Sequence, residues 1–246
     1  SQSVSRETLE LLEKGLMYSS LSDGKFDITI EPVSSLWDFS SGEGKVPDAD
    51  SIKEALAFID YKKVGIKDQT VSLDEGMGID LGAIAKGYIA DQIKEYLLSQ
   101  GIEKAMINLG GNVLCVGSKP DGTDFRVGIR DPFQTGNLAA AIAVSDKSVV
   151  TSGTYERFIE ENGVRYHHIL DPKTGYSYNN NLESVTIVSD YSVDGDGLST
   201  TCFALGLTDA LKLINSMDDV YAMFIDSNGK IVYSDGFEKE FDVTLY

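Results

Sequence analysis

Two adjacent histidines supply the only imidazole groups of the chain, in the segment Arg165-Tyr-His-His-Ile-Leu-Asp-Pro-Lys-Thr-Gly175. Imidazole is the side chain that exchanges a proton near neutral pH without a special environment, so acid–base chemistry of this kind requires His167 or His168. Neighbouring residues of an extended segment face opposite sides, and only one of the pair can point into a given site. A strand histidine is more often structural than catalytic, so the residues alone leave both roles open.

Hard oxygen ligands occur together in the segment Asp194-Gly-Asp-Gly-Leu-Ser-Thr200. At the start of a helix, Asp196 and Thr200 lie four residues apart and share one face. Mg²⁺ binds such oxygens and completes its shell with water or phosphate oxygens. An aspartate N-cap followed by a helical threonine explains the same pattern. An EF-hand is excluded, because Phe203 stands where that loop requires a bidentate glutamate.

The segment Asp80-Leu-Gly-Ala-Ile-Ala-Lys86 is typical of an anion-binding helix start. We predict a helix over residues 82–99, with Asp80 as N-cap and Gly82 allowing close approach of the backbone. Lys86 then falls near the first turn, where the helix dipole disfavours a cation unless an anion lies over the N-terminus. A surface lysine whose stem covers apolar neighbours is the alternative. The Gly-Lys-Ser/Thr order of a Walker loop is absent.

Composition limits the classes of function. The 246 residues carry a formal net charge of −18, and 42% of them are hydrophobic, which is enough to form a proper core. Such acidity disfavours nucleic acid, and a phosphate site would need a bound cation and a few placed lysines or arginines. No apolar run approaches the roughly 20 residues of a membrane helix. Cys115 and Cys202 lack metal-type spacing, and their pairing stays open.

Helices and strands are expected in separate runs, which favours an α+β fold with a mixed, largely antiparallel sheet and packed helices. Helical spacing predicts helices over residues 5–21, 48–59, 82–99, 198–207 and about 208–217. Strand-like patterns occur over residues 26–30, 64–66, 70–73, 105–108, 113–116, 125–129, 138–144, 149–151, 165–170, 184–188, 221–225 and 231–233. We find no internal repeat and no interdomain linker, and therefore expect a single domain over residues 1–246.

Several unlinked motifs, in the same order, resemble the ApbE-type FAD:protein FMN transferases. They are Gly24-Lys-Phe-Asp-Ile-Thr followed by Pro32 and Trp37, Asp80 to Tyr88, Asn108-Leu-Gly-Gly-Asn112, Ser152-Gly-Thr-Tyr-Glu-Arg157, His168-Ile-Leu-Asp-Pro-Lys-Thr-Gly175 and Asp196 to Thr200. The resemblance covers essentially the whole chain. It implies an ApbE-like, T-fold-related flavin transferase domain.

The resemblance implies a Mg²⁺-dependent reaction. FAD is split at its diphosphate, FMN is joined to a threonine hydroxyl of an acceptor protein of a redox or electron-transfer system, and AMP leaves. By motif, the Ala83 carbonyl, Asp196 and Thr200 would hold the metal, with Ser199 close by. His168 would take the proton from the acceptor hydroxyl, with Lys86 and Asp196 as further catalytic groups. The residues that would contact FAD are Lys25, Phe26, Asp27, Asp80, Lys86 and Ile169.

Members of this family usually begin several tens of residues upstream, with a strand that also lines the flavin pocket, and that segment is absent ahead of Ser1. Glu31 stands where the family often has glycine. The resemblance also implies an extracytoplasmic place, periplasmic or as a cell-surface lipoprotein, with membrane contact only through a removed N-terminal anchor. Two alternatives are a FAD pyrophosphatase releasing FMN and AMP, and a flavin-binding or carrier protein without turnover.

Overall fold

The computed structural model describes residues 1–39, 41, 44–134 and 136–246. Its contacts divide the chain into two compact units, each built from two separate stretches of sequence. Unit 1 comprises residues 1–82 and 154–180, and unit 2 comprises residues 83–153 and 181–246. Each unit is described by itself below. The prediction of a single domain over residues 1–246 stays a prediction.

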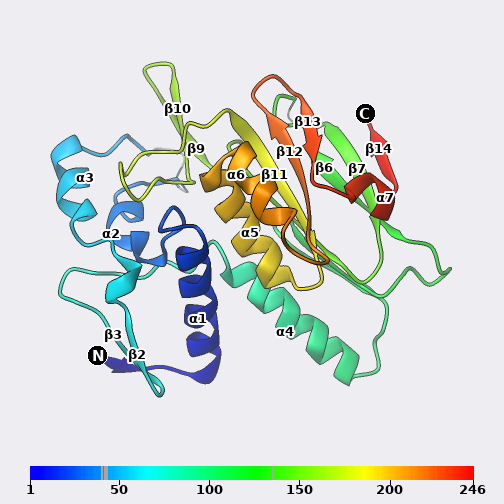
Figure 1. The fold of residues 1–246 in the computed structure, drawn as a ribbon, viewed down its shortest axis with the longest axis horizontal. Helices are drawn as coiled ribbons and strands as arrows, with labels where there is room; N and C mark the ends of the chain where they lie inside the picture. Colours follow the sequence, from blue (N-terminus) through cyan, green and yellow to red (C-terminus); the bar gives the residue numbers. More distant parts are fainter. Residues whose placement is uncertain (40, 42–43, 135) are drawn as a thin grey trace. The chain divides into compact units, whose positions relative to one another are not determined.

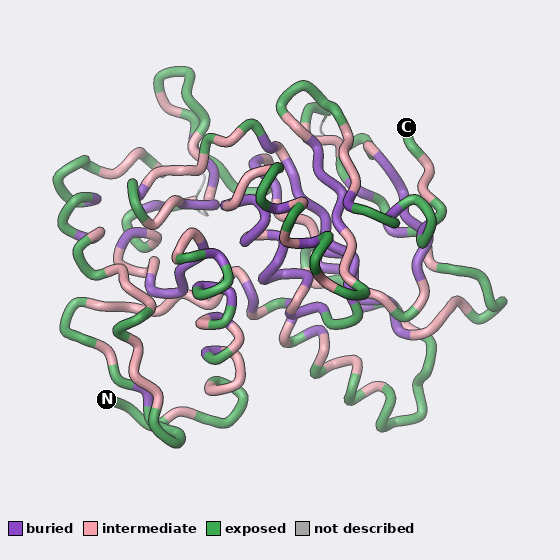
Figure 2. Tube along the Cα trace, in the orientation of Figure 1, coloured by how far each residue is buried: buried purple, intermediate pink, exposed green. Residues whose placement is uncertain are grey.

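Unit 2 is built around a six-stranded antiparallel sheet with the strand order β13-β12-β11-β8-β5-β4 (Figure 1). Its strands are β4 (Ala105–Leu109), β5 (Asn112–Val116), β8 (Ser148–Gly153), β11 (Leu182–Ser189), β12 (Tyr221–Asp226) and β13 (Ile231–Tyr233). The central strand β11 is buried along nearly its whole length, and β5 is buried throughout (Figure 2). Strands buried on both faces are expected where a second layer covers each side.

A second, three-stranded antiparallel sheet in unit 2 has the order β14-β7-β6. It consists of β6 (Phe125–Arg130), β7 (Leu138–Val144) and β14 (Val243–Leu245). Apolar side chains of both sheets and of the short helix α7 (Phe237–Glu240) form one core cluster, which includes Val113, Ile142, Val188, Met223 and Phe237. One face of the six-stranded sheet is therefore covered by the smaller sheet.

Helices of unit 2 pack on the six-stranded sheet as well (Figure 1). They are α4 (Ala85–Ser99), α5 (Ser192–Leu205) and α6 (Leu207–Ile214). Ala90 of α4 packs with Ile107 and Leu114 of the sheet in a second core cluster. Gly195 of α5 lies against Val150 of β8, where an added Cβ would come within 2.7 Å of a Val150 methyl group. The side chain of Val150 points to the face opposite that of Val149, so the helices cover the face that the smaller sheet leaves open.

Unit 1 combines short helices with two small pieces of sheet. Its helical elements are α1 (Arg6–Leu21), the 3₁₀ turn η1 (Ile28–Ile30), α2 (Glu31–Ser34), α3 (Ala49–Leu56) and the 3₁₀ turn η2 (Tyr61–Lys63). Strands β1 (Gln2–Ser3), β3 (Thr70–Ser72) and β2 (Gly65–Lys67) form one antiparallel sheet, and β9 (Phe158–Glu161) and β10 (Val164–His167) form a hairpin.

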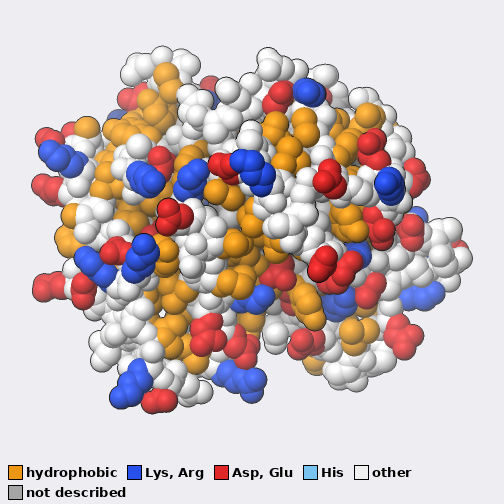
Figure 3. Space-filling model, in the orientation of Figure 1, with side chains coloured by type: hydrophobic (Ala, Val, Ile, Leu, Met, Phe, Trp, Pro, Cys, Tyr) orange, Lys and Arg blue, Asp and Glu red, His pale blue; other side chains and the backbone are white. Residues whose placement is uncertain are grey.

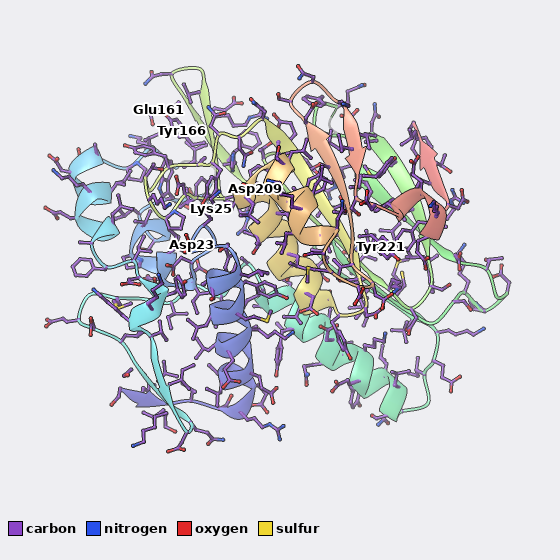
Figure 4. The ribbon with its side chains drawn as sticks, in the orientation of Figure 1. Asp23, Lys25, Glu161, Tyr166, Asp209 and Tyr221 are labelled. Atoms are coloured by element: carbon purple, nitrogen blue, oxygen red, sulfur yellow. The ribbon has the colours of Figure 1, made fainter. Side chains whose placement is uncertain are left out.

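Aromatic residues hold the core of unit 1 together. Trp37 is buried, its indole N–H donates to the carbonyl of Gly175 at 3.0 Å, and its ring stacks on Phe39 with a centroid distance of 5.4 Å. Tyr166 from the β9–β10 hairpin packs against the same indole (Figure 4). The segment that follows the histidine pair is thus anchored to residues near position 37.

Most predicted elements are present, but one predicted strand is not formed and two helices begin at other residues than predicted. Residues 26–30 do not form a strand, because the Asp27 carboxylate accepts hydrogen bonds from the Thr29 backbone and hydroxyl and bends the chain into η1. Helix α4 begins at Ala85, and Asp80 is not its cap. Helix α5 begins at Ser192 rather than residue 198, so Asp194 and Asp196 lie inside it.

The predicted α+β class with mainly antiparallel sheets is confirmed. Within the described residues no helix has both the length and the apolar character needed to cross a bilayer. Cys115 and Cys202 are both buried free thiols, and burial raises the pKa of Cys115 to about 11 and that of Cys202 to about 12. Neither thiol is therefore activated as a nucleophile.

Candidate functional site

Asp196 is a buried carboxylate on the second turn of α5, with 5% of its surface exposed. Its Oδ2 accepts the backbone N–H of Gly87 at 2.6 Å, and its Oδ1 accepts the side-chain N–H of Asn112 at 3.0 Å. Gly87 belongs to the first turn of α4, whose N-cap residue Ile84 makes no side-chain cap. The carboxylate of one helix therefore satisfies an amide at the open start of another.

A second carboxylate makes the reverse contact. Asp91 on α4 accepts the backbone N–H of Ser192 at 2.8 Å and that of Val193 at 2.9 Å, and these two residues open α5. The N-cap residue of α5, Tyr191, makes no side-chain cap either. Each helix start is thus capped by an aspartate of the other helix.

A chain of hydrogen bonds fixes the orientation of Asp196. Ser148 donates to Ser192 at 2.9 Å, the Ser192 hydroxyl donates to Oδ1 of Asn112 at 2.8 Å, and the Asn112 amide donates to Asp196. Because Oδ1 of Asn112 accepts from Ser192, its NH₂ group must face the carboxylate. All four side chains are buried. Buried networks of this kind hold their members in one orientation when every polar group is paired.

Hydroxyl groups gather where α5 meets β8. The Ser152 hydroxyl lies 2.8 Å from that of Ser199 and 3.2 Å from that of Thr200. Ser199 also donates to the Asp196 backbone carbonyl at 3.0 Å. Ser199 and Thr200, both predicted metal ligands, therefore lie in one cluster with Ser152, one helical turn from Asp196.

Burial raises the pKa of Asp196 above its usual value. The hydrogen bonds from Asn112 and Gly87 and the charge of Lys86 act in the opposite direction. The donors that touch the carboxylate are neutral amides, so the ionised form at neutral pH is poorly compensated. A buried charge of this kind is stable only when paired or bound to a metal.

The residues around Asp196 fit a hard divalent cation. Each carboxylate oxygen accepts one hydrogen bond and keeps a second lone pair, and hydroxyl oxygens lie one turn away. In a regular helix the Gly87 N–H would donate to the carbonyl of Ala83. Here it donates to Asp196, so Ala83 does not belong to the regular helix. Among the described residues no group of three or more His, Cys, Asp or Glu is placed to bind a metal.

Unit 1 contains the histidine pair, and the two rings face different surroundings, as predicted. His167 is buried, its Nε2 lies 2.9 Å from the Tyr178 carbonyl, and its Nδ1 accepts the Ile169 N–H at 3.3 Å. Burial lowers the pKa of His167 below its usual value, while the Tyr178 contact opposes that effect. Both ring nitrogens of His167 thus contact backbone groups of unit 1, which gives the ring a structural role.

His168 is only partly buried and follows the last residue of β10. Its backbone N–H donates to the Arg157 carbonyl at 3.1 Å, and its Nδ1 lies 3.3 Å from the same oxygen. A proton on Nδ1 satisfies this contact and places the basic lone pair on Nε2. The geometry suits a general base held by one ring nitrogen.

The remaining predicted flavin contacts of unit 1 are mostly engaged within that unit. Asp80 accepts the Gly82 N–H at 2.8 Å and the Ser34 hydroxyl at 2.9 Å. Lys25 follows α1, and its carbonyl accepts the Tyr178 hydroxyl at 2.7 Å (Figure 4). Phe26 is buried against Tyr18, so core packing accounts for its ring.

Asp27 is buried, and its carboxylate accepts hydrogen bonds from Thr29 and from the Tyr61 N–H. Ile169 is buried, and its carbonyl accepts the Tyr178 N–H at 3.0 Å. Both residues support the local structure of unit 1. Their predicted contacts with FAD stay predictions.

The structure brings together Asp196, Ser199 and Thr200, with Ala83 and Lys86 at the start of the neighbouring helix. His168, Asp80 and the residues near Lys25 belong to unit 1. The hypothesis that an imidazole and a metal flank one diphosphate needs both units, and it stays a prediction.

Sequence reasoning missed Asp91, Ser148 and Ser192 and treated Asn112 mainly as part of a loop. One signal in the sequence could have pointed to Asp91. It follows Gly87 by four residues, so a carboxylate and a glycine share one face of the predicted helix. Ser148 and Ser192 gave no signal, because their contacts join positions 44 residues apart.

Comparison with known proteins identifies the family of this chain. The sequence model of the ApbE family matches residues 1–224. A FAD:protein FMN transferase of Klebsiella pneumoniae is 40% identical over 235 residues, covering 94% of this chain and 72% of the relative. The FAD:protein FMN transferase of Treponema pallidum is 39% identical over 250 residues, covering 95% of this chain and 69% of the relative.

Solved structures agree in fold. The ApbE protein of Thermotoga maritima superposes with a TM-score of 0.88 at 33% identity, covering 96% of this chain and 78% of that one. The flavin transferase ApbE of Vibrio cholerae gives 0.85 at 30% identity, with 96% and 77% covered. The chain belongs to the ApbE family. Its predicted class, an enzyme that transfers a group, is confirmed.

Proposed function

We propose that this protein is a FAD:protein FMN transferase that attaches FMN to a threonine hydroxyl of an acceptor protein. The bond between the FMN phosphorus and the bridging oxygen of the FAD diphosphate is broken, and the bridging oxygen leaves as part of AMP. The threonine oxygen forms a new bond to the FMN phosphorus, its proton passes to a base, and AMP leaves. The observation that carries the proposal is the buried Asp196 carboxylate beside a cluster of hydroxyls, in a chain whose relatives have this activity by name.

The proposed metal is Mg²⁺, held by Asp196, Thr200 and the Ala83 carbonyl, with Ser199 beside them. When bound, the ion neutralises charge that develops on the diphosphate oxygens. Such a cation is needed, because the net charge of −18 repels a dinucleotide. Lys86 supplies a second positive charge near Asp196.

His168 is the proposed base. A threonine hydroxyl is a weak nucleophile unless a base removes its proton as the new bond forms. The contact of Nδ1 with the Arg157 carbonyl orients the ring and leaves Nε2 to accept that proton. The acceptor hydroxyl must come within about 3 Å of this nitrogen in the productive complex.

The test is to incubate the protein with FAD, MgCl₂ and a threonine-bearing acceptor protein and to follow the acceptor by intact-mass spectrometry. We expect the acceptor to gain one FMN, AMP to be released in equal amount, and EDTA to abolish both. Free FMN with an unmodified acceptor would indicate a FAD pyrophosphatase. Bound FAD without any product would indicate a flavin carrier.

We further propose that the protein works outside the cytoplasmic membrane, because the family that it resembles is often exported. The location is tested by cell fractionation of the full-length protein in its own host. Recovery in the cytoplasmic fraction would contradict this part of the proposal and leave the chemistry untouched.

A further inference from the structure

Asp91 is a partly buried carboxylate that has no part in the proposed chemistry. Its two oxygens accept the N–H groups of Ser192 and Val193, at 2.8 and 2.9 Å. Burial raises the pKa of Asp91, and these two hydrogen bonds oppose the rise. Hydrogen bonds from two backbone N–H groups thus favour the charged form of a carboxylate that is partly shielded from water.

The two partners are the first two residues of α5, the helix that carries Asp196, Ser199 and Thr200. Neither α4 nor α5 has a side-chain cap from its own N-cap residue. The side-chain caps come instead from the other helix: Asp196 accepts an N–H group of α4, and Asp91 accepts two N–H groups of α5. The two contacts run in opposite directions between the same pair of helices.

The backbones of the two helices touch at this point. A Cβ added to Gly87 would lie 2.2 Å from the Ser192 carbonyl oxygen and 2.7 Å from the Val193 Cα. Since Gly87 and Asp91 are four residues apart, they present one face of α4 to the start of α5. The crossing therefore has little freedom to slide while both caps are in place.

We propose that Asp91 is a positioning residue for the metal ligands. By holding the first turn of α5, it fixes Asp196 and Thr200 relative to Ala83, which lies just ahead of Ile84, the N-cap residue of α4. This inference rests on the proposed function, since that function supplies the metal. Mg²⁺ requires near-ideal octahedral geometry at about 2.0–2.1 Å, so a shift of α5 by a fraction of an ångström weakens its binding.

The test compares Asp91→Asn with Asp48→Asn. Asparagine keeps the shape of Asp91 but offers one acceptor oxygen to two N–H groups. Asp48 is the control, because it caps another helix start, that of α3 in unit 1, where one of its carboxylate oxygens accepts the N–H groups of both Asp50 and Ser51. Mg²⁺ affinity is measured by titration calorimetry with MgCl₂, stability by thermal unfolding, and FMN transfer as a function of Mg²⁺ concentration.

We expect Asp91→Asn to weaken Mg²⁺ binding by about 10-fold or more, the range seen when a group that orients a metal ligand is lost. The transfer rate at saturating Mg²⁺ should stay within a few fold of wild type, because no reacting group is removed. Asp48→Asn should leave the Mg²⁺ affinity unchanged, because asparagine keeps one acceptor oxygen for the start of α3, a helix that carries no proposed metal ligand. A purely structural role of Asp91 would not produce this separation.

Equal Mg²⁺ affinity in Asp91→Asn and wild type would overturn the inference, and so would equal losses in the two variants. If Asp91→Asn does not fold, Asp91→Ser carries the same test, since its short hydroxyl leaves room for water, and unchanged Mg²⁺ affinity would overturn the inference there too. A wild-type protein that binds Mg²⁺ but transfers no FMN contradicts the proposed function alone, and the binding comparison still decides the role of Asp91. A wild-type protein that binds no Mg²⁺ overturns both.

Discussion

Adjacent side chains of the same type have different surroundings in this protein. His167 lies in the interior with its Nε2 against the Tyr178 carbonyl, whereas His168 is partly exposed and contacts the Arg157 carbonyl through Nδ1. Thr200 shares a hydroxyl cluster with Ser152, whereas the buried hydroxyl of Thr201 has no hydrogen-bond partner in the described part of the chain. These pairs allow each proposed role to be tested against its neighbour.

Replacing His168 by alanine should reduce the FMN transfer rate by about 10²–10⁴-fold, the usual contribution of a general base. FAD binding, followed by quenching of flavin fluorescence, should be nearly unchanged. His167→Gln is the control, since glutamine can still donate to the Tyr178 carbonyl, and it should keep most of the activity at pH 7. Transfer at the wild-type rate in His168→Ala would remove this residue from the mechanism.

His167 also predicts a dependence of stability on pH. Its pKa in the folded protein is lowered from the usual 6.5 by burial. The unfolded state therefore binds more protons just below pH 6.5, and the free energy of unfolding must fall as the pH drops from about 6.5 toward the folded-state pKa. Urea unfolding at several pH values measures this slope, which should be shallower in His167→Gln. Identical slopes would contradict it.

Thr200→Val and Thr201→Val test the metal site with the same change at neighbouring positions. Thr200→Val removes a proposed ligand, so the Mg²⁺ concentration for half-maximal transfer should rise by about 10-fold or more. Thr201→Val removes an unpaired buried hydroxyl and should raise the free energy of unfolding by about 1 kcal/mol without changing Mg²⁺ dependence. Equal Mg²⁺ dependence in both variants would argue against Thr200 as a ligand.

At the scale of elements, the crossing of α4 and α5 determines the candidate site. Gly87 permits backbone contact with Ser192, Asp196 caps α4, and Asp91 caps α5. A helix pair without this close approach would separate the donors of the two helices. The candidate site therefore depends on Gly87, which lets the two helices approach, as much as on the carboxylates of Asp196 and Asp91.

Gly87→Ala should therefore be strongly destabilising, by about 1–3 kcal/mol or more, because its Cβ meets backbone that cannot move alone. Gly195→Ala is the matched change on α5, where the added Cβ meets a methyl group of Val150 that can shift. We expect the smaller loss for Gly195→Ala, since alanine also favours the helix. Denaturant unfolding of both variants measures the difference, and the reverse order would contradict this packing.

At the scale of the whole molecule, charge opposes the substrate. Asp and Glu outnumber Lys and Arg by 39 to 21, and on the face shown in Figure 3 the two kinds are interspersed. FAD carries a diphosphate, so the average field of the protein repels it. Local positive charge, from Lys86 and from the proposed cation, has to overcome this repulsion.

Without Mg²⁺, added salt should strengthen FAD binding several-fold, because salt screens the repulsion over about 10 Å at 0.1 M and less at higher concentration. Flavin fluorescence titrations in EDTA at low and high NaCl measure this effect. A weakening of FAD binding with salt would show that local cations already dominate the field at the site.

The sequence alone predicted most of the fold, because hydrophobic period and turn residues act locally. The helix over residues 5–21 and the strands over residues 221–225 and 231–233 are examples. The start of α5 was missed, because the N-cap residue Tyr191 makes no side-chain cap and the packing of Gly195 against Val150 joins distant segments. Helix starts without their own caps give no local signal.

For the site, the sequence by itself determined which residue types were available: one pair of imidazoles, the carboxylates and hydroxyls near position 196, and the family to which their order points. Only the tertiary structure decided that His167 is structural, that Asp196 rather than Asp80 caps α4, and that Asp91 holds α5. The reason is physical. The chemical type of each residue and the local hydrophobic period can be read from the sequence. Burial and long-range hydrogen bonds depend on which distant segments pack together.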